Sequence, residues 1–251
     1  MARRAGSVLA GPRRGLARRL RDVPPGRRLR QQLALAAIES HTHGRADVRL
    51  LDAGSEEGLL CLELARRHPG WRLVAADWSA APLHRGRGWA RAEGLPVLYV
   101  RCDMQRGVGH AVYDVVVAME SLVEIPDDRA ALRSMATALR PGGLFVAQVP
   151  TADWTPALRG ADRTWRREAR HGYDAAELTA ALDAVGLDVI EIRPTFRRTV
   201  ALAQDVRDRL KRRGRLVQLA LLALSAGAVR LERSGLTWGP PRALLVVAVR
   251  R

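Results

Sequence analysis

The feature that most limits the fold is a series of short apolar segments that end in an acidic residue or a glycine turn. Four of them, each followed by a polar turn or helical stretch, cover residues 48–53, 71–76, 97–102 and 115–117. Nearly continuous apolar runs of this length are typical of strands buried on both faces of a parallel sheet. Further strands are expected at 144–149, 187–192 and 244–249, and helices at 27–40, 80–94, 127–139, 174–185, 199–213 and 215–231. Alternating βα units predict an α/β fold, with helices on both faces of a mainly parallel sheet.

The charge of the 251-residue chain is distributed unevenly. Residues 1–30 hold ten arginines and one acidic residue, residues 31–192 hold 18 arginines and 22 acidic residues, and residues 193–251 hold 14 basic and three acidic residues. The first 25 residues are predicted to be a disordered basic arm. Residues 26–251 are predicted to form a single domain, whose central part is mildly acidic.

Composition argues against several classes of site. The central part is not basic, and only 11 of 251 residues are aromatic, so a nucleic-acid partner is disfavoured. Cys61 and Cys102 are too few for a disulfide framework. His41 and His43 lack a third ligand at a supporting distance, so no metal is expected. No apolar run reaches 18 residues, so no membrane span is expected, and a cytoplasmic location is predicted.

The residues that follow the strands are the candidates for binding, because ligands of parallel sheets sit at the carboxyl ends of the strands. Asp52 ends the first strand and precedes a turn, Gly54-Ser55-Glu56-Glu57-Gly58, that opens a helix. Glycine lets a ligand approach the backbone, and the start of the helix offers free N–H groups. This turn is therefore a candidate anion or cofactor site.

Two further acidic residues end the second and third strands. Asp77 lies 25 residues after Asp52, where a carboxylate can accept hydrogen bonds from both hydroxyls of a ribose. Asp103 can accept a hydrogen bond from an adenine amino group, and Trp78 and Met104 can enclose a planar base. The alternatives are purely structural: both carboxylates can cap turns, and both apolar side chains can pack.

Five motifs in order resemble the class I S-adenosylmethionine-dependent methyltransferases over about residues 48–193. They are Leu51–Gly58, Asp77, Asp103, the segment 113–127 and the turn 139–144. The resemblance implies a Rossmann-like seven-stranded sheet with strand order 3-2-1-4-5-7-6, in which residues 244–250 form the antiparallel seventh strand. It also implies S-adenosylmethionine as cofactor, with Gly54 and Gly58 beside its methionine part, Asp77 on the ribose and Asp103 on the adenine.

The same resemblance directs attention to residues that depart from the family pattern. Glu56 stands where the family usually has glycine, and its carboxylate can contact the cofactor's ammonium or repel its carboxylate. Glu120 ends the fourth strand and is a candidate for both cofactor binding and catalysis. Glu124 stands where many members have histidine. It is interpreted as a base, a polar anchor or a solvated loop residue.

The general base is assigned from the segment before the helix at 174–185. His171 is the candidate base and Tyr173 a candidate wall of the acceptor pocket. The alternative is that residues 170–173 cap and pack the helix that follows.

The segments 150–173 and 194–241 are expected to cover the pocket, the second as a helical insertion before the last strand. Residues 207–224 place basic groups beside an apolar helix, which favours a pocket cover, a dimer contact or a peripheral contact with an anionic membrane. The predicted function is methyl transfer from S-adenosylmethionine to a small-molecule acceptor by in-line displacement, in a monomer or homodimer. The alternatives are a non-catalytic cofactor-binding protein, an RNA methyltransferase and an NAD-linked oxidoreductase. The last is disfavoured because the chain lacks the G-x-G-x-x-G order.

Overall fold

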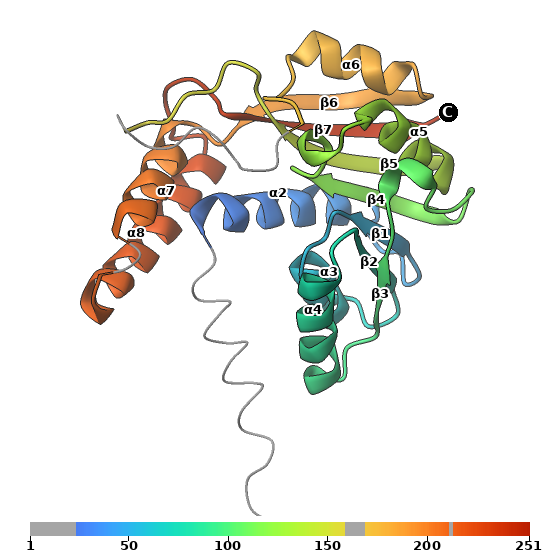
Figure 1. Ribbon diagram of the computed structural model, residues 1–251, viewed down its shortest axis with the longest axis horizontal. Helices are drawn as coiled ribbons and strands as arrows, with labels where there is room; N and C mark the ends of the chain where they lie inside the picture. Colours follow the sequence, from blue (N-terminus) through green and yellow to red (C-terminus); the bar gives the residue numbers. More distant parts are fainter. Residues whose placement is uncertain (1–23, 159–168, 211–212) are drawn as a thin grey trace, which may run out of the picture.

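A computed structural model describes residues 24–158, 169–210 and 213–251, and its strands form one seven-stranded sheet (Figure 1). The strands lie in the order β3-β2-β1-β4-β5-β7-β6. Their bounds are β1 Arg49–Ala53, β2 Arg72–Asp77, β3 Val97–Arg101, β4 Tyr113–Met119, β5 Leu139–Pro150, β6 Leu187–Thr195 and β7 Ala243–Arg250. Strands β1 to β5 pair in parallel, whereas β7 is antiparallel to both β5 and β6. The predicted strand order and the reversed last strand are confirmed.

Helices cover both faces of the sheet, as the βα pattern predicts (Figure 1). Their bounds are α2 Pro25–His41, α3 Leu59–Arg67, α4 Ala80–Glu93, α5 Asp128–Ala138, α6 Ala175–Asp183, α7 Arg198–Leu210 and α8 Arg215–Arg233, with short 3-10 helices η1 Met104–Arg106 and η2 Leu122–Glu124. Neighbouring residues of β4 show the division: Val115 and Val117 pack in the core beneath α2 and α3, while Val116 and Ala118 pack beneath α5 and α6. Side chains that alternate along β4 therefore pack in two separate hydrophobic cores, one on each face of the sheet.

Local signals in the sequence set several of the element ends. Asp127 caps α5 by accepting a hydrogen bond from the Ala130 N–H, and Asp174 caps α6 in the same way from Glu177. Strand β5 begins at Leu139, earlier than the predicted residue 144. Tyr113 pairs with Leu139, and the next pair is Val115 with Leu144. The Arg-Pro-Gly-Gly turn between Leu139 and Leu144 therefore bulges out of the ladder inside β5.

The insertion before the last strand folds as a helical hairpin, α7 and α8, which we call the α7–α8 hairpin. Both of its helices pack against α2, and Figure 1 shows the hairpin at one end of α2 and α3 at the other. Its base is held by Asp205, which is buried and pairs with the buried Arg242 at 3.0 Å. Asp205 also accepts hydrogen bonds from the N–H groups of Ala157 and Leu158 at 2.7 and 3.0 Å. One carboxylate thus joins the hairpin, the loop after β5 and the start of β7.

The predicted basic arm lies almost wholly outside the described residues, and Pro25 already begins α2. Trp165, Lys211 and Arg212, which belong to the predicted pocket-covering segments, also lie outside them.

Candidate active site

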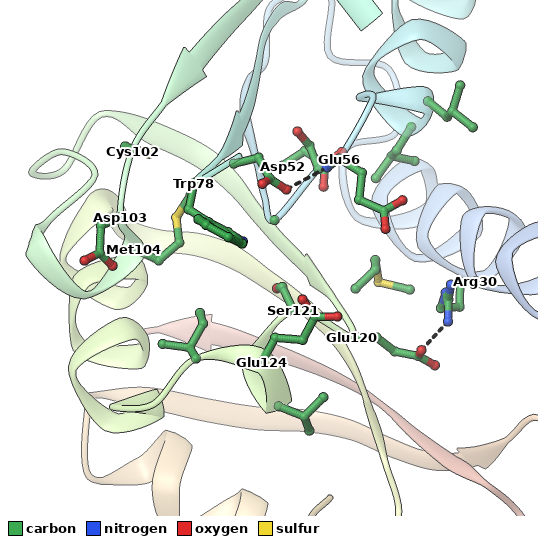
Figure 2. Close-up of a pocket in the computed structure, with 18 of the residues that line it drawn as sticks. Arg30, Asp52, Glu56, Trp78, Cys102, Asp103, Met104, Glu120, Ser121 and Glu124 are labelled. Atoms are coloured by element: carbon green, nitrogen blue, oxygen red, sulfur yellow. Dashed lines mark hydrogen bonds and ion pairs between the residues drawn. The ribbon is translucent and has the colours of Figure 1, made fainter. Parts of the chain in front are cut away.

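A cavity of about 630 Å³ opens at the carboxyl ends of strands β1 to β4, a volume that suits a cofactor or small ligand. Its wall is formed by the ends of these four strands and the turns after them, by the start of α3, by Pro150 at the end of β5 and by one face of α2. Figure 2 shows Trp78, Asp103 and Met104 toward one end of the cavity and Arg30 and Glu120 toward the other. The cavity therefore lies where ligands of parallel sheets are expected to bind, at the carboxyl ends of the strands.

The turn after β1 can only be made with glycine at its first position. Gly54 has φ of +82°, and a Cβ atom there would lie 2.3 Å from the Cβ of Ser121 in the turn after β4. The N–H groups of Gly54 and Ser55 both donate to the carbonyl of Ala76, at 2.8 and 2.9 Å. Ser55 belongs to the cavity wall, and its hydroxyl is buried without a hydrogen-bond partner in the described residues. A buried hydroxyl without a partner in a cavity wall is a candidate contact for a polar ligand.

Gly58 differs from Gly54, because it does not line the cavity. It precedes α3 in the left-handed conformation, with φ of +68°. A Cβ there would lie 2.9 Å from the Cβ of Ala75 and 3.0 Å from the ring of Tyr99. Gly58 is thus required for close packing of the turn on β2 and β3, and the structure gives it no direct place in the cavity wall.

Asp77 both lines the cavity and caps the turns around it. It is 6% exposed, and its two oxygens accept hydrogen bonds from the backbone N–H groups of Glu56 at 2.9 Å and Ser79 at 2.8 Å. A carboxylate has about four lone-pair sites, so two remain for a ligand. Asp77 therefore does cap turns, as the structural alternative from the sequence proposed. These hydrogen bonds fix the orientation of its carboxylate beside the cavity.

The turns after β2 and β3 place the remaining sequence candidates, Trp78, Asp103 and Met104, toward one end of the cavity. Asp103 accepts hydrogen bonds from the backbone and side-chain N–H groups of Gln105, and these bonds lower its pKa from the ordinary value. Met104 is buried, whereas 58% of Trp78 is exposed (Figure 2). An exposed indole beside a cavity offers a flat apolar face on which a planar ligand can stack.

Asp52 is the most strongly perturbed carboxyl group of the cavity wall. Burial is the main cause that raises its pKa to about 7; the charge of Arg27 opposes this shift, and the charges of Asp77 and Glu56 support it. The group therefore changes its charge near neutral pH. A cationic ligand in the cavity would favour its ionised form.

The wall formed by α2 was not expected from the sequence. Arg27, Arg30 and Gln31 line the cavity. Arg27 binds Glu56 at 2.7 Å, and Arg30 binds Glu120, which has φ of +62° (Figure 2). The spacing of the three residues, i, i+3 and i+4, places them on one helix face, and this signal was present in the sequence.

These contacts bear on the unusual carboxylate at position 56. The family usually has glycine there, and a lone carboxylate would oppose an anionic group of a ligand. In the structure the guanidinium of Arg27 lies against the carboxylate of Glu56, so the pair presents no net charge to the cavity.

His171 and Tyr173, the predicted base and pocket wall, are not brought into the cavity. His171 is exposed, and neither residue is part of the wall. Tyr173 is fully buried, and its hydroxyl donates to Asp128 at 2.6 Å, with the guanidinium of Arg170 over its ring at 3.8 Å. A bridge between Thr151 and Tyr173 holds the segment beside the sheet, so its aromatic ring packs with α5 and α6. The structure therefore agrees with the alternative interpretation, in which residues 170–173 cap and pack the helix that follows them.

The described residues of the expected pocket cover also lie almost wholly outside the cavity wall. In the described part of the chain, no residue of 194–241 lines the cavity, and the 150–173 segment contributes Pro150. Helix α2 occupies that side instead, and the α7–α8 hairpin packs behind it.

The sequence was also compared with known families. The model of a family described as a methyltransferase domain matches residues 15–192. The chain belongs to this family. The resemblance to class I S-adenosylmethionine-dependent methyltransferases is thereby confirmed.

Curated relatives of this methyltransferase-family chain share part of its length. The ubiquinone biosynthesis O-methyltransferase of Erwinia tasmaniensis is 30% identical over 147 residues, which cover 57% of the chain and 60% of the relative. The enzyme of the same name from Idiomarina loihiensis is 28% identical over 169 residues, 63% of the chain and 69% of the relative. The chain spans about half to two thirds of the length of the curated relatives it matches.

Solved structures with the same fold have low sequence identity. An S-adenosylmethionine-dependent methyltransferase from Mesorhizobium loti has a TM-score of 0.58 at 21% identity, covering 88% of this chain and 98% of that one. Phosphoethanolamine N-methyltransferase 2 of Haemonchus contortus, solved with S-adenosylmethionine, has a TM-score of 0.61 at 15% identity, covering 87% and 52%. The SpnF cyclase has a TM-score of 0.61 at 21% identity, covering 88% and 80%. These likenesses show the fold, and the reaction must be argued from the site.

Proposed function

We propose that the chain transfers the methyl group of S-adenosylmethionine to a hydroxyl oxygen of a small molecule. The observation that carries this proposal is one continuous cavity, whose wall includes Gly54, Asp77 and Asp103 and extends to Glu120 and Glu124. The choice of oxygen rests on the curated relatives, which are named O-methyltransferases.

The residues of the cavity suit such a cofactor. Its methionine part fits beside Gly54 and the unpartnered hydroxyl of Ser55, within reach of the guanidinium groups on α2. Asp77, with two free lone-pair sites, suits the ribose hydroxyls.

At the end of the cavity away from Arg30 and Glu120, the adenine of the cofactor would stack on Trp78 and Met104 (Figure 2). The amino group of the adenine would donate a hydrogen bond to Asp103. Asp52, when ionised, would attract the cationic groups of the cofactor.

The reaction needs alignment and the removal of one proton. When bound, S-adenosylmethionine supplies a methyl group on a positively charged sulfur. Transfer of this methyl group to a hydroxyl oxygen would require that the hydroxyl lose its proton, and a carboxylate of the chain would accept that proton. Both Glu120 and Glu124 line the cavity beyond the glycine turn, which supports them as candidate acceptors of this proton. Arg30 positions Glu120 by its ion pair, and the walls of the cavity hold the reactants in line.

The decisive experiment is calorimetric titration of S-adenosylmethionine into the parent and the variant Asp77→Ala. We expect micromolar binding by the parent and about 100-fold weaker binding by the variant, because charged hydrogen bonds to the ribose are lost. Asp127→Ala is the matched control: it also removes a capping carboxylate, but one that does not line the cavity, so it should bind like the parent.

A turnover assay on a panel of hydroxylated small molecules then separates an enzyme from a binding protein. Glu120→Gln and Glu124→Gln are expected to lower kcat while the dissociation constant of S-adenosylmethionine stays close to that of the parent. A folded parent that does not bind would overturn the proposal. Binding without turnover on the panel would favour the non-catalytic alternative, and turnover on RNA would favour the RNA methyltransferase.

The small-molecule acceptor, the monomeric or homodimeric state and the cytoplasmic location remain predictions. The membrane contact expected at 207–224 is likewise a prediction, and none of the described residues of this range lines the cavity.

A further inference from the structure

Helix α8 carries apolar side chains on its outer face. Leu216 is 84% exposed, Leu219 62%, Leu224 45% and Leu231 41%. Their spacing, together with the exposed Ala220 and Ala223 between them, places them along one side of the helix. We call this row of side chains the leucine stripe.

The leucine stripe is not needed to fold the α7–α8 hairpin. The opposite side of α8 carries the packing residues, since Leu221, Ser225, Ala228 and Val229 are buried. The outer leucines also take no part in the cavity wall. Monomeric proteins rarely expose a continuous apolar surface of this kind without a binding role.

The charges around the stripe are predominantly positive. Arg213 lies just before α8, and Arg230 and Arg233 lie in its last turn, all exposed. Residues 193–251 contain 14 basic and three acidic residues. Of the three acidic residues, Asp205 is buried against Arg242, and Glu232 accepts hydrogen bonds from the backbone N–H of Arg197. The apolar stripe is therefore bordered by cations at both ends.

We propose that the leucine stripe docks the protein on an anionic phospholipid bilayer. The pattern of exposed leucines with flanking arginines is that of a helix lying in the membrane interface. A stripe-to-stripe contact with a second copy would bring like-charged arginines together, whereas anionic headgroups neutralise them.

The geometry of α8 agrees with a helix that lies flat on the bilayer. Its 19 residues extend over about 28 Å, and in the described ranges no helix is long and apolar enough to cross a membrane. After the helix, Leu236 is 68% and Trp238 60% exposed. An exposed indole next to such a helix suits the headgroup region, where tryptophan is enriched. Figure 1 shows the hairpin extending away from the sheet, which leaves its outer side accessible.

The test is flotation of the full-length protein with vesicles of phosphatidylcholine, with and without phosphatidylglycerol. We expect binding only when phosphatidylglycerol is present, and a double variant Leu216→Ser/Leu219→Ser should lower the partition coefficient at least about 10-fold, because two leucine side chains lose their transfer to the interface. Leu98→Ser is the matched control. Leu98 is 60% exposed on β3, so its replacement should leave partitioning unchanged. The basic residues 1–23 are present in every variant, so the comparison isolates the contribution of α8.

Two results would overturn the proposal. One is equal binding by the parent and the leucine variant, with binding lost in Arg230→Gln/Arg233→Gln, because this would mean adsorption by charge alone. The other is absence of vesicle binding by the parent, together with a dimer in sedimentation that the leucine variant dissociates, which would assign the stripe to a second copy.

Discussion

The cavity and the α7–α8 hairpin depart from the usual rules of burial in opposite directions. At the cavity, carboxyl groups are buried: Asp52 and Asp77 are 5% and 6% exposed. On the hairpin, leucines face solvent. Both arrangements are unfavourable in an isolated protein, since charge loses hydration in the first and apolar surface meets water in the second. The comparison indicates that binding partners are to be sought both at the buried carboxyl groups of the cavity and at the exposed leucines of the hairpin.

The two regions differ in how firmly their side chains are held. The carboxylates of Asp77 and Asp103 are fixed by backbone N–H groups, so their direction is set before a ligand arrives. The leucine stripe has no such restraint, because its side chains meet solvent. We therefore expect the cavity to select ligands by geometry and the hairpin to accept a deformable surface.

The largest expected effect concerns the base of the hairpin. Replacing Asp205 by Ala leaves Arg242 buried without its partner and removes the acceptor for two backbone N–H groups. We expect a loss of about 3–5 kcal/mol in the free energy of unfolding, measured by urea denaturation. Asp208→Ala, one turn along and exposed, should change it by less than about 0.5 kcal/mol. Equal effects of the two variants would mean that the hairpin does not depend on this buried pair.

A smaller effect is expected where α2 meets the glycine turn. Arg27→Gln leaves the carboxylate of Glu56 without its cation beside the cavity. We expect binding of S-adenosylmethionine to weaken about 10-fold, the value of one charge-assisted hydrogen bond. Adding Glu56→Gly should restore most of the affinity, since the uncompensated charge is removed. A double variant as weak as Arg27→Gln would instead mean that Arg27 acts on the ligand directly.

The smallest effect is a dependence of cofactor affinity on pH. Because burial raises the pKa of Asp52 to about 7, its carboxyl group is largely neutral below that pH and ionised above it. A cationic cofactor prefers the ionised form, so we expect affinity to rise a few-fold between about pH 6 and pH 7.5. Asp52→Asn should flatten this profile.

The free protein supplies an independent check of the same shift. A carboxyl group with a raised pKa disfavours folding as pH rises from its ordinary value, 3.8, to about 7. The stability of Asp52→Asn relative to the parent should therefore increase over this window in thermal unfolding. A constant difference would contradict the shift.

The sequence predicts those parts of the site that depend on local order along the chain. The strand ends carry Asp77 and Asp103 into one edge of the sheet because parallel strands share that edge, and the caps at Asp127 and Asp174 mark where helices begin. The wall formed by α2 could not be found in this way. Arg27 meets Glu57 30 residues away, and Arg30 meets Glu120 90 residues away, so the docking of the helix decides both contacts.

The segment before α6 shows a second limit of local patterns. The order Arg170-His171-Gly172-Tyr173 is compatible with a ring that faces the cavity or the core, because a helix start fixes the backbone and leaves the direction of the preceding residues open. The bridge from Tyr173 to Thr151 and the hydrogen bond to Asp128 settle the direction, and both join residues distant in sequence.

The contact between Gly54 and Ser121 sets how closely two halves of the proposed reaction can approach. Gly54 belongs to the turn proposed to hold the methionine part of the cofactor, and Ser121 lies between the two carboxylates proposed to accept the proton, Glu120 and Glu124. The hydroxyl of Ser121 also donates to the carbonyl of Ala53 at 2.8 Å, so the two turns are tied together. A single methyl group at position 54 would force them apart by about 1 Å, a displacement that costs an aligned reaction about 100-fold in rate. In the proposed reaction, the separation of the two turns thus depends on a residue whose side chain is a single hydrogen atom.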